Sequence, residues 1–373
     1  MLFSVATRDD ILAERVNGKQ LITLNRPKAL NTLNLSMVRK LYPILKNCND
    51  DPDVLFILIK GAGKQAFCAG GDVVAISRSA QASSPSNTVY RDFFREEYIM
   101  NHLIGTLKVP YIAIMDGITM GGGCGLSVHG KYRIATENTV LSMPEAAIGL
   151  FPDVGGTHFL SRLPYSLGQF MALTGYRVTG ADVYHMGLAT HYVPSKRLED
   201  LETELVNTDV RLFSSEKIDR ILNKYHVREN EIPKFSLVKR LAQIDYIFGG
   251  STIESIFKKL RNDTDSFGKK QFTILNKMSP LSLKVICRQL QIGSKMHFPE
   301  IFTMEYRLSQ RFVQNHDFHE GCRAILIDKD HKPQWKPPNI EEVTDDIVDK
   351  YFTPLIEDDL IITDAFKDRK VTS

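Results

Sequence analysis

The chain has 373 residues and a formal net charge of +3; 24% of its residues are charged and 43% are hydrophobic. This composition is typical of a globular protein with a sizeable core, and the length predicts either two domains or one extended domain. The net charge is too small to indicate a nucleic acid or a membrane surface as partner. The five cysteines have no metal-ligand spacing, which favours free thiols in a reducing compartment and predicts no metal site.

The beginning of the chain does not look like a transit peptide, because Asp9 and Asp10 come early and such peptides are poor in acids. We therefore expect a start that is either untargeted or already trimmed. The purest apolar run, residues 54–59, is much too short to span a membrane and predicts a buried strand.

Strands alternate with helices along the first two hundred residues, which predicts an α/β fold. Asn17-Gly18 is a dipeptide suited to a tight turn between two strands, so a hairpin is expected near the start. Pro43 interrupts the helical spacing of apolar residues that begins at residue 35. The expected strands cover residues 11–16, 20–24, 54–60 and 109–115, and helices are expected over residues 35–47 and after Asp72.

The character of the chain changes at about residue 205, where helical patterns rich in Lys, Arg and Glu replace the strand-like runs. Ser279-Pro280 is typical of a helix start, with serine as the cap and proline in the first turn. The proline-rich stretch from Asp330 predicts an extended tail that packs as a strap. We therefore expect a core domain with the site over residues 1–205, and a mainly helical region with that tail over residues 206–373.

The segment 143–156 holds two carboxylates, Glu145 and Asp153, among apolar residues, glycines and prolines. Ionised carboxylates in apolar surroundings are costly unless they are paired, and their pKa values shift. The glycines and prolines favour a turn-rich wall over one continuous helix. Either acid alone is more typical of a cap or an ion-pair partner, but the two together favour acid/base chemistry.

Two glycine-containing loops, residues 66–72 and 116–125, each follow a predicted strand. Glycines let the backbone approach a ligand closely, and N–H groups at a helix start attract negative charge. If the loops converge, they offer two N–H donors to one carbonyl oxygen, as in an oxyanion hole. A glycine run alone is usually only a turn, and neither a phosphate-loop Gly-Lys-Ser/Thr nor a dinucleotide fingerprint is present.

Taken in order, these motifs resemble the crotonase (enoyl-CoA hydratase/isomerase) superfamily. The matching stretches are residues 24–27, 30–31, 67–72, 121–125 and 144–145. The resemblance implies an α/β fold built as a spiral of ββα units, followed here by the helical C-terminal region. It also implies a coenzyme A thioester whose carbonyl lies between two backbone N–H groups, which by position fall near Ala69 and at Gly122.

One branch of the superfamily, its thioester hydrolases, shares four further stretches with this chain: residues 93–98, 143–156, 276–280 and 317–330 with 332–335. Hydratases of the superfamily use two glutamates, and the position of the first is occupied here by Gly125, which cannot carry a proton. The second corresponds to Glu145. Hydratases have a glycine eight residues later, where this chain has Asp153. The chain therefore departs from the hydratase pattern and keeps that of the hydrolases.

The resemblance implies hydrolysis of a short β-hydroxyacyl-CoA thioester, with coenzyme A as part of the substrate and no metal or redox cofactor. Glu145 would be the general base or the nucleophile. Asp153 would orient the substrate hydroxyl or shuttle a proton. Glu97 matches a substrate-contacting position and could bond the hydroxyl, although Glu96-Glu97 more often marks a solvated helix face. A mitochondrial matrix location follows from the family, and a homo-oligomer is possible.

Two other functions fit part of this pattern. A dienoyl-CoA isomerase also has acids at the positions of Glu145 and Asp153, but it carries a third acid at the position of Gly125 and lacks the C-terminal extension. A non-catalytic acyl-CoA-binding protein on the same fold is the other alternative. Retention of both acids and both glycine loops disfavours it.

Overall fold

The computed structural model describes residues 9–82, 88–209, 214–356 and 358–362. The expectation about the start of the chain falls mostly on residues 1–8, outside the described ranges. The chain forms two compact units, each assembled from three segments. The first unit comprises residues 1–72, 103–143 and 176–241, and the second comprises 73–102, 144–175 and 242–373. Residue 205, where the chain was expected to change character, lies inside helix α8 (Leu198–Asn207) of the first unit.

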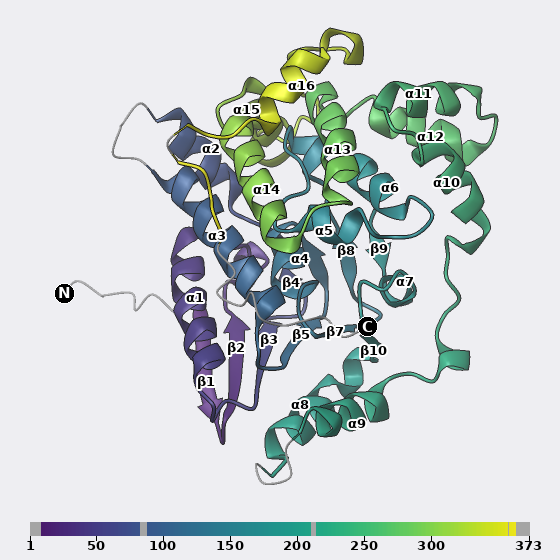
Figure 1. The fold of residues 1–373 in the computed structure, drawn as a ribbon. Helices are drawn as coiled ribbons and strands as arrows, with labels where there is room; N and C mark the ends of the chain where they lie inside the picture. The colour runs from purple at the N-terminus through teal and green to yellow at the C-terminus, as the bar shows by residue number, and fades with distance from the viewer. Residues whose placement is uncertain (1–8, 83–87, 210–213, 357, 363–373) are drawn as a thin grey trace. The chain divides into compact units, whose positions relative to one another are not determined.

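A six-stranded sheet organises the first unit, in the order β1-β2-β3-β5-β7-β10 (Figure 1). The expected hairpin is confirmed: β1 and β2 are antiparallel, and Asn17 and Gly18 both take positive φ, at 48° and 78°. From β2 onward the neighbouring strands are parallel. The strands are β1 (Ile11–Val16), β2 (Lys19–Leu24), β3 (Phe56–Gly61), β5 (Tyr111–Met115), β7 (Tyr132–Ala135) and β10 (His191–Tyr192).

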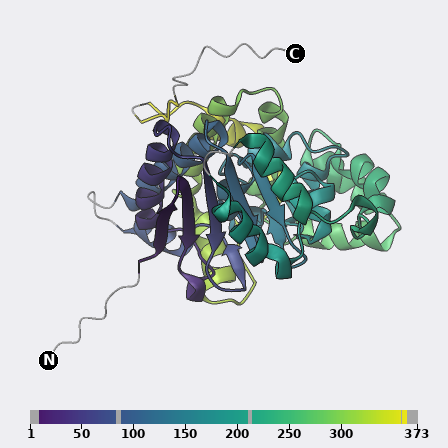
Figure 2. The same cartoon turned by 90° about the horizontal axis from the view of Figure 1, so that it is seen from below.

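Helices of the first unit pack on this sheet because alternate strand residues point to the same face. Side chains of β3, β5 and β7 form one apolar core with helices α8 and α9 (Ser215–Tyr225). Helix α1 (Leu35–Asp50) runs beside the first strands (Figure 2) and continues through Pro43, further than its spacing predicted. Four buried apolar residues stabilise that helix across the proline: Met37, Val38, Leu41 and Leu45.

A smaller four-stranded sheet in the same unit carries the glycine loops. Its order is β4 (Ala66–Cys68), β6 (Ile118–Met120), β8 (Val140–Ser142) and β9 (Val178–Thr179), and the first three are parallel. The carboxyl ends of adjacent parallel strands meet at one edge of a sheet, so β4 and β6 deliver their loops to the same edge. Helices α4 (Gly122–Ser127) and α7 (Ala181–His185) also belong to this unit.

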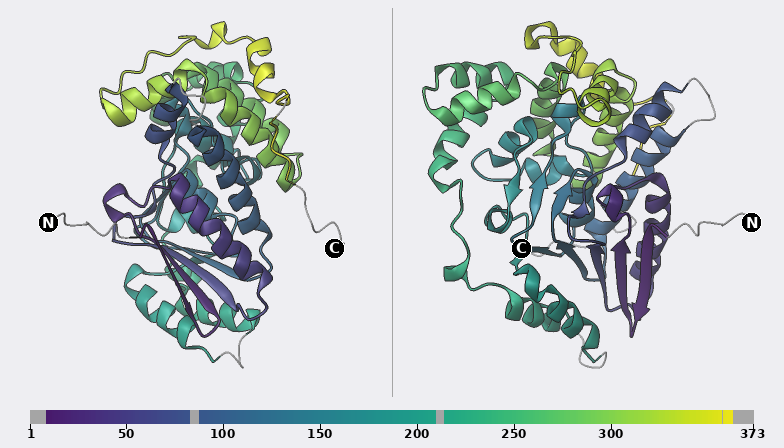
Figure 3. Two further views of the ribbon diagram at one scale, coloured as in Figure 1. Left: turned by 90° about the vertical axis from the view of Figure 1, so that its left-hand side faces the viewer. Right: turned by 180° about the vertical axis from the view of Figure 1, so that it is seen from behind.

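The second unit is mainly helical, as expected for the C-terminal region, but it also takes segments from the N-terminal half. Figure 3 shows its long helices α13 and α14. Its helices are α2 (Val73–Gln81), most of α3 (Val89–Thr106), α5 (Gly156–Leu160), α6 (Leu167–Thr174), α10 (Leu241–Phe248), α11 (Ile253–Asn262), α12 (Ser266–Leu275), α13 (Pro280–Gly293), α14 (Phe298–Phe312), α15 (His316–Cys322) and α16 (Asp345–Phe352). No helix within the described ranges is long and apolar enough to cross a membrane.

Asp317 ties the C-terminal segments of this unit together. It is fully buried, and its carboxylate accepts hydrogen bonds from Ser279 Oγ (2.7 Å) and from the backbone N–H of Lys336 (2.8 Å). The backbone N–H of Ser279 donates in turn to the carbonyl of Ala146 at 3.2 Å. Two of the stretches shared with the thioester hydrolases, residues 276–280 and 317–330, therefore meet at this carboxylate, next to the turn that carries Glu145.

Ser279→Ala tests this junction. Ser279 caps α13 by accepting from the N–H of Ser282, as the sequence predicted, and it also donates to Asp317. Loss of the helix cap costs roughly 1 kcal/mol. Leaving the buried Asp317 oxygen without its donor costs about as much or more. Urea titration should therefore show that the free energy of unfolding falls by about 2 kcal/mol or more. Ser214→Ala, at the exposed cap of α9, is the matched control and should lose only about half as much. If both variants lost the same free energy of unfolding, the hydrogen bond from Ser279 to Asp317 would add nothing to the stability, which would contradict the role of Asp317 as the junction.

Candidate active site

Three of the acids singled out from the sequence lie in the second unit, and all three are buried. Glu97 is on α3, Glu145 begins the 3-10 turn η2 (Glu145–Ile148), and Asp153 lies in the loop before α5. Their exposed fractions are 1%, 5% and 6%. The alternative that Glu97 belongs to a solvated helix face is therefore wrong.

Local geometry explains the turn at Glu145. Gly149 ends it with φ of 67°, in the left-handed region that favours glycine. A side chain at Gly149 would meet the carbonyl oxygen of Asp317 at 2.2 Å, so only glycine fits there. The prediction of a turn-rich wall over this segment is confirmed.

Burial gives these carboxylates unusual electrostatics. The pKa of Glu97 is raised well above its ordinary value by burial and then by repulsion from Asp153. Burial and the charge of Asp153 likewise raise the pKa of Glu145. Burial also raises the pKa of Asp153, against the lowering effect of the Tyr98 hydroxyl, which donates to Asp153 Oδ2 at 2.9 Å. No ion pair to these three carboxylates is present among the described residues, so the group is suited to holding and moving protons near neutral pH.

Two of these acids keep a free oxygen. Glu97 Oε1 and Glu145 Oε2 are buried without a hydrogen-bond partner among the described residues. Buried polar atoms in native proteins are almost always paired, and exceptions call for a functional explanation. Both oxygens are therefore available to a substrate or to the attacking water.

A fourth buried carboxylate, Glu305 on α14, was missed from the sequence. It is fully buried and accepts three hydrogen bonds from the loop after Asp153: from Gly155 N–H (2.7 Å), Thr157 N–H (3.0 Å) and Thr157 Oγ1 (2.6 Å). Burial raises its pKa to about 8, although those bonds lower it in part. One signal was present in the sequence: Glu305 occupies a position in the apolar stripe of α14 that includes Ile301, Leu308 and Phe312.

Gln289 on α13 completes the support of the same loop. Its Nε2 donates to the carbonyl of Pro152 at 2.7 Å and to Thr157 Oγ1 at 2.6 Å. We call residues 152–157 the Asp153 loop; Gln289 and Glu305 both hold it through hydrogen bonds, and both contact the hydroxyl of Thr157. These hydrogen bonds join the C-terminal helices α13 and α14 to residues 144–175 within the second unit.

The two glycine loops of the first unit do converge, which the sequence left open. A side chain at Gly123 would meet the carbonyl oxygen of Cys68 at 2.2 Å, so the start of α4 and the end of β4 are in close contact. Gly122 is the first residue of α4, and the N–H groups of a helix's first turn have no acceptor within the helix. Its N–H is therefore free to bind a ligand.

The second predicted donor needs a correction. The N–H of Ala69 donates to the carbonyl of Leu30 at 3.0 Å, so it is not free in the structure. Gly71, two residues later, forms a parallel β-bridge with Leu33. In this bridge the N–H of Leu33 donates to the carbonyl of Gly70, and the N–H of Asp72 donates to the carbonyl of Leu33, both at 2.8 Å. The N–H of Gly71 therefore points away from Leu33. The geometry favours Gly71 over Ala69 as the partner donor of Gly122.

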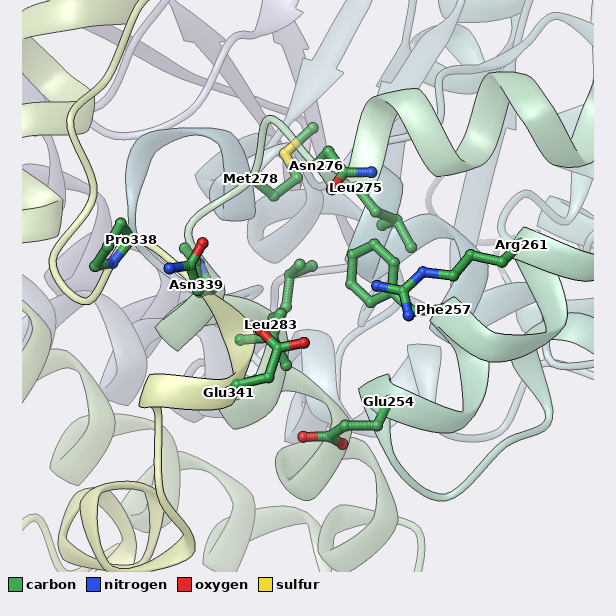
Figure 4. Close-up of a pocket in the computed structure, with 12 residues that line it drawn as sticks. Glu254, Phe257, Arg261, Leu275, Asn276, Met278, Leu283, Pro338, Asn339 and Glu341 are labelled. Atoms are coloured by element: carbon green, nitrogen blue, oxygen red, sulfur yellow. The ribbon is translucent and has the colours of Figure 1, made fainter.

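A cavity of about 220 Å³ among the C-terminal helices contains none of these residues (Figure 4). It is lined mainly by α11, the start of α13 and residues 338–341. One of its acids, Glu254, is already paired with Lys284 at 2.7 Å. Across the described ranges, no group of three or more His, Cys, Asp or Glu side chains is arranged to hold a metal ion.

The pH dependence of stability tests the burial of Glu305. In the folded protein this carboxyl keeps its proton up to about pH 8, whereas in the unfolded chain it loses it near 4.5. The contribution of the protonated Glu305 carboxyl to the free energy of unfolding is thus complete below pH 4.5, and it is lost as the pH rises toward 8. In Glu305→Gln, the fall in unfolding free energy between pH 5 and 8 should be shallower by up to about 1.4 kcal/mol per pH unit, as measured by urea titration. Glu199→Gln, at an exposed position on α8, should leave the slope unchanged. Parallel curves for Glu305→Gln and the parent would refute the assignment.

Comparison with known proteins agrees with the sequence motifs. The family model described as enoyl-CoA hydratase/isomerase matches residues 19–352. A Gallus gallus protein named 3-hydroxyisobutyryl-CoA hydrolase, mitochondrial, is 50% identical over 353 residues, covering 94% of this chain and 90% of the relative. A Xenopus laevis protein of the same name is 51% identical over 341 residues, covering 91% of this chain and 87% of the relative.

A solved structure shows the same fold. The structure of a carnitinyl-CoA dehydratase from Mycobacterium thermoresistibile is similar with a TM-score of 0.86 and 36% identity, covering 94% of this chain and 98% of that chain. The predicted crotonase-type α/β fold with a helical C-terminal region is confirmed. The chain belongs to the enoyl-CoA hydratase/isomerase family.

Proposed function

We propose that the protein hydrolyses 3-hydroxyisobutyryl-CoA to 3-hydroxyisobutyrate and free coenzyme A, as a step of valine catabolism in the mitochondrial matrix. The relatives named for this activity are about 50% identical over nine-tenths of the chain. The observation that carries the proposal is the pair of buried carboxylates Glu145 and Asp153 in a chain that has Gly125 at the hydratase glutamate position.

The hydratase and dehydratase activities of other family members fit the residues less well. Adding water across a double bond in this family uses two glutamates, and Gly125 cannot carry a proton. The dehydratase with a similar solved structure is also less similar in sequence, at 36% identity, than the hydrolases. A dienoyl-CoA isomerase carries a third acid at the position that Gly125 occupies in this chain.

In the proposed reaction, the thioester carbonyl accepts hydrogen bonds from the N–H groups of Gly122 and Gly71. These bonds strengthen as the carbonyl oxygen becomes an oxyanion. Loss of one donor typically raises the activation free energy by roughly 3 kcal/mol. Water attacks the carbonyl carbon, the C–S bond breaks, and the coenzyme A sulfur leaves with a proton. Both donors come from loops of the first unit.

Glu145 takes the proton of the attacking water, or attacks the carbonyl itself through an anhydride that water then opens. Its raised pKa makes the ionised form a strong base. Asp153, oriented by Tyr98 and held in the Asp153 loop by Gln289 and Glu305, passes a proton or orients the substrate hydroxyl. Glu97, with its free Oε1, binds that hydroxyl.

No metal or redox cofactor is needed, because the acids and backbone N–H groups supply the proton transfer and the oxyanion stabilisation. The partner is the acyl-CoA substrate itself.

A thiol-trapping assay with 3-hydroxyisobutyryl-CoA tests the proposal. The parent protein should release free coenzyme A, and Glu145→Gln and Asp153→Asn should each lower kcat by roughly 10²- to 10⁴-fold through loss of proton transfer. Glu199→Gln, exposed on α8, is the control and should keep full activity. Absence of coenzyme A release together with isomerisation of a dienoyl-CoA would favour the isomerase. Retained coenzyme A binding with no turnover of either compound would favour a binding protein.

A further inference from the structure

Helix α3 carries a second buried polar residue, Asn101, one turn beyond Glu97. Asn101 is fully buried, and neither its Nδ2 nor its Oδ1 has a hydrogen-bond partner among the described residues. Residues four apart lie on the same face of a helix. One face of α3 therefore presents three unpaired buried polar atoms: both ends of the Asn101 amide and Glu97 Oε1.

Clusters of buried polar atoms without hydrogen-bond partners are rare in folded proteins. A buried amide with both ends unpaired is costly, and native structures keep very few of them. The neighbouring Tyr98 does not need this explanation, because its hydroxyl is engaged by Asp153 at 2.9 Å. Three unpaired atoms on one helix face point to a group that pairs with them when substrate is bound.

The chemistry of the three atoms identifies that group. The Asn101 amide offers one donor end and one acceptor end, and the Glu97 carboxyl offers an acceptor, to which protonation adds a donor. A carboxylate or phosphate would be repelled by the two acceptors, and an ammonium group would be repelled by the amide N–H. A plain alkyl group would leave all three atoms unpaired. A hydroxyl, which donates and accepts at once, satisfies the set.

We propose that Asn101 is a specificity-determining residue that binds the β-hydroxyl of the acyl group together with Glu97. The assignment rests on the proposed function. A site built to hydrogen-bond a hydroxyl rejects the analogue that lacks it, because the polar atoms of the site are then left unpaired in the complex. Asn101 thus sets the preference for hydroxyacyl over plain acyl thioesters.

The test compares kcat/KM for 3-hydroxyisobutyryl-CoA and for isobutyryl-CoA, which differ only in the hydroxyl. The parent protein should prefer the hydroxyacyl thioester. In Asn101→Leu, which keeps the volume, the ratio of the two values should fall by about tenfold or more, mainly through the hydroxyacyl substrate. Asn101→Ala should show the same fall if the leucine variant does not fold.

The matched control is Asn49→Leu. Asn49 is also buried in a helix, but its Oδ1 accepts from the N–H of Lys108 at 2.8 Å, so its loss should lower stability and leave the ratio unchanged. Equal losses on both thioesters in the Asn101 variants would overturn the assignment and make Asn101 structural.

Failure of the proposed function would look different, because the parent itself would then release no coenzyme A from either thioester. In that case the test compares the dissociation constants of the two thioesters, measured for the parent and for Asn101→Leu, in place of kcat/KM. A preference for the hydroxyacyl thioester that disappears in Asn101→Leu supports the assignment. Equal binding of both thioesters by the parent overturns it.

Discussion

The burial of four carboxylates in one unit is the constraint on which the candidate site depends. Glu97, Glu145, Asp153 and Glu305 are all nearly or fully inaccessible, and no ion pair to them is present in the described ranges. Removing carboxylates from water is expensive, so they hold their protons more tightly or depend on donated hydrogen bonds. The C-terminal helices supply part of that support, through Gln289 and Glu305 on the Asp153 loop and through Ser279 and Asp317 beside the Glu145 turn.

This arrangement gives the C-terminal half a structural role at the proposed site. A superfamily core alone would carry the glycine loops and the Glu145 turn, but the loop that holds Asp153 is fixed by α13 and α14. Unpaired buried atoms such as Glu145 Oε2 lower the stability of the free protein, and under the proposed function the substrate or the attacking water would pair with them. Binding of the substrate should therefore stabilise the fold as well as begin the reaction.

Much of the fold could be predicted from local signals. The Asn17-Gly18 turn, the strand before Gly61 and the Ser279 cap each depend on a few neighbouring residues, and the structure confirms them. The interleaved units could not be predicted, because they arise from contacts between segments more than a hundred residues apart. Glu305 was missed for the same reason. Gly71 takes the place of Ala69 in the proposed oxyanion hole because the Ala69 N–H already donates to the carbonyl of Leu30, which lies in a distant turn.

Titration of individual carboxyl groups in the free protein tests the central claim most directly. With ¹³C-labelled Asp and Glu side chains, the resonances that disappear in Glu145→Gln and Asp153→Asn identify the two acids in NMR spectra. The account predicts that both titrate well above their ordinary values of 4.5 and 3.8, because burial disfavours their charged forms. Titration of both groups near those ordinary values would show that the acids are solvated, and it would contradict a buried proton-transfer site.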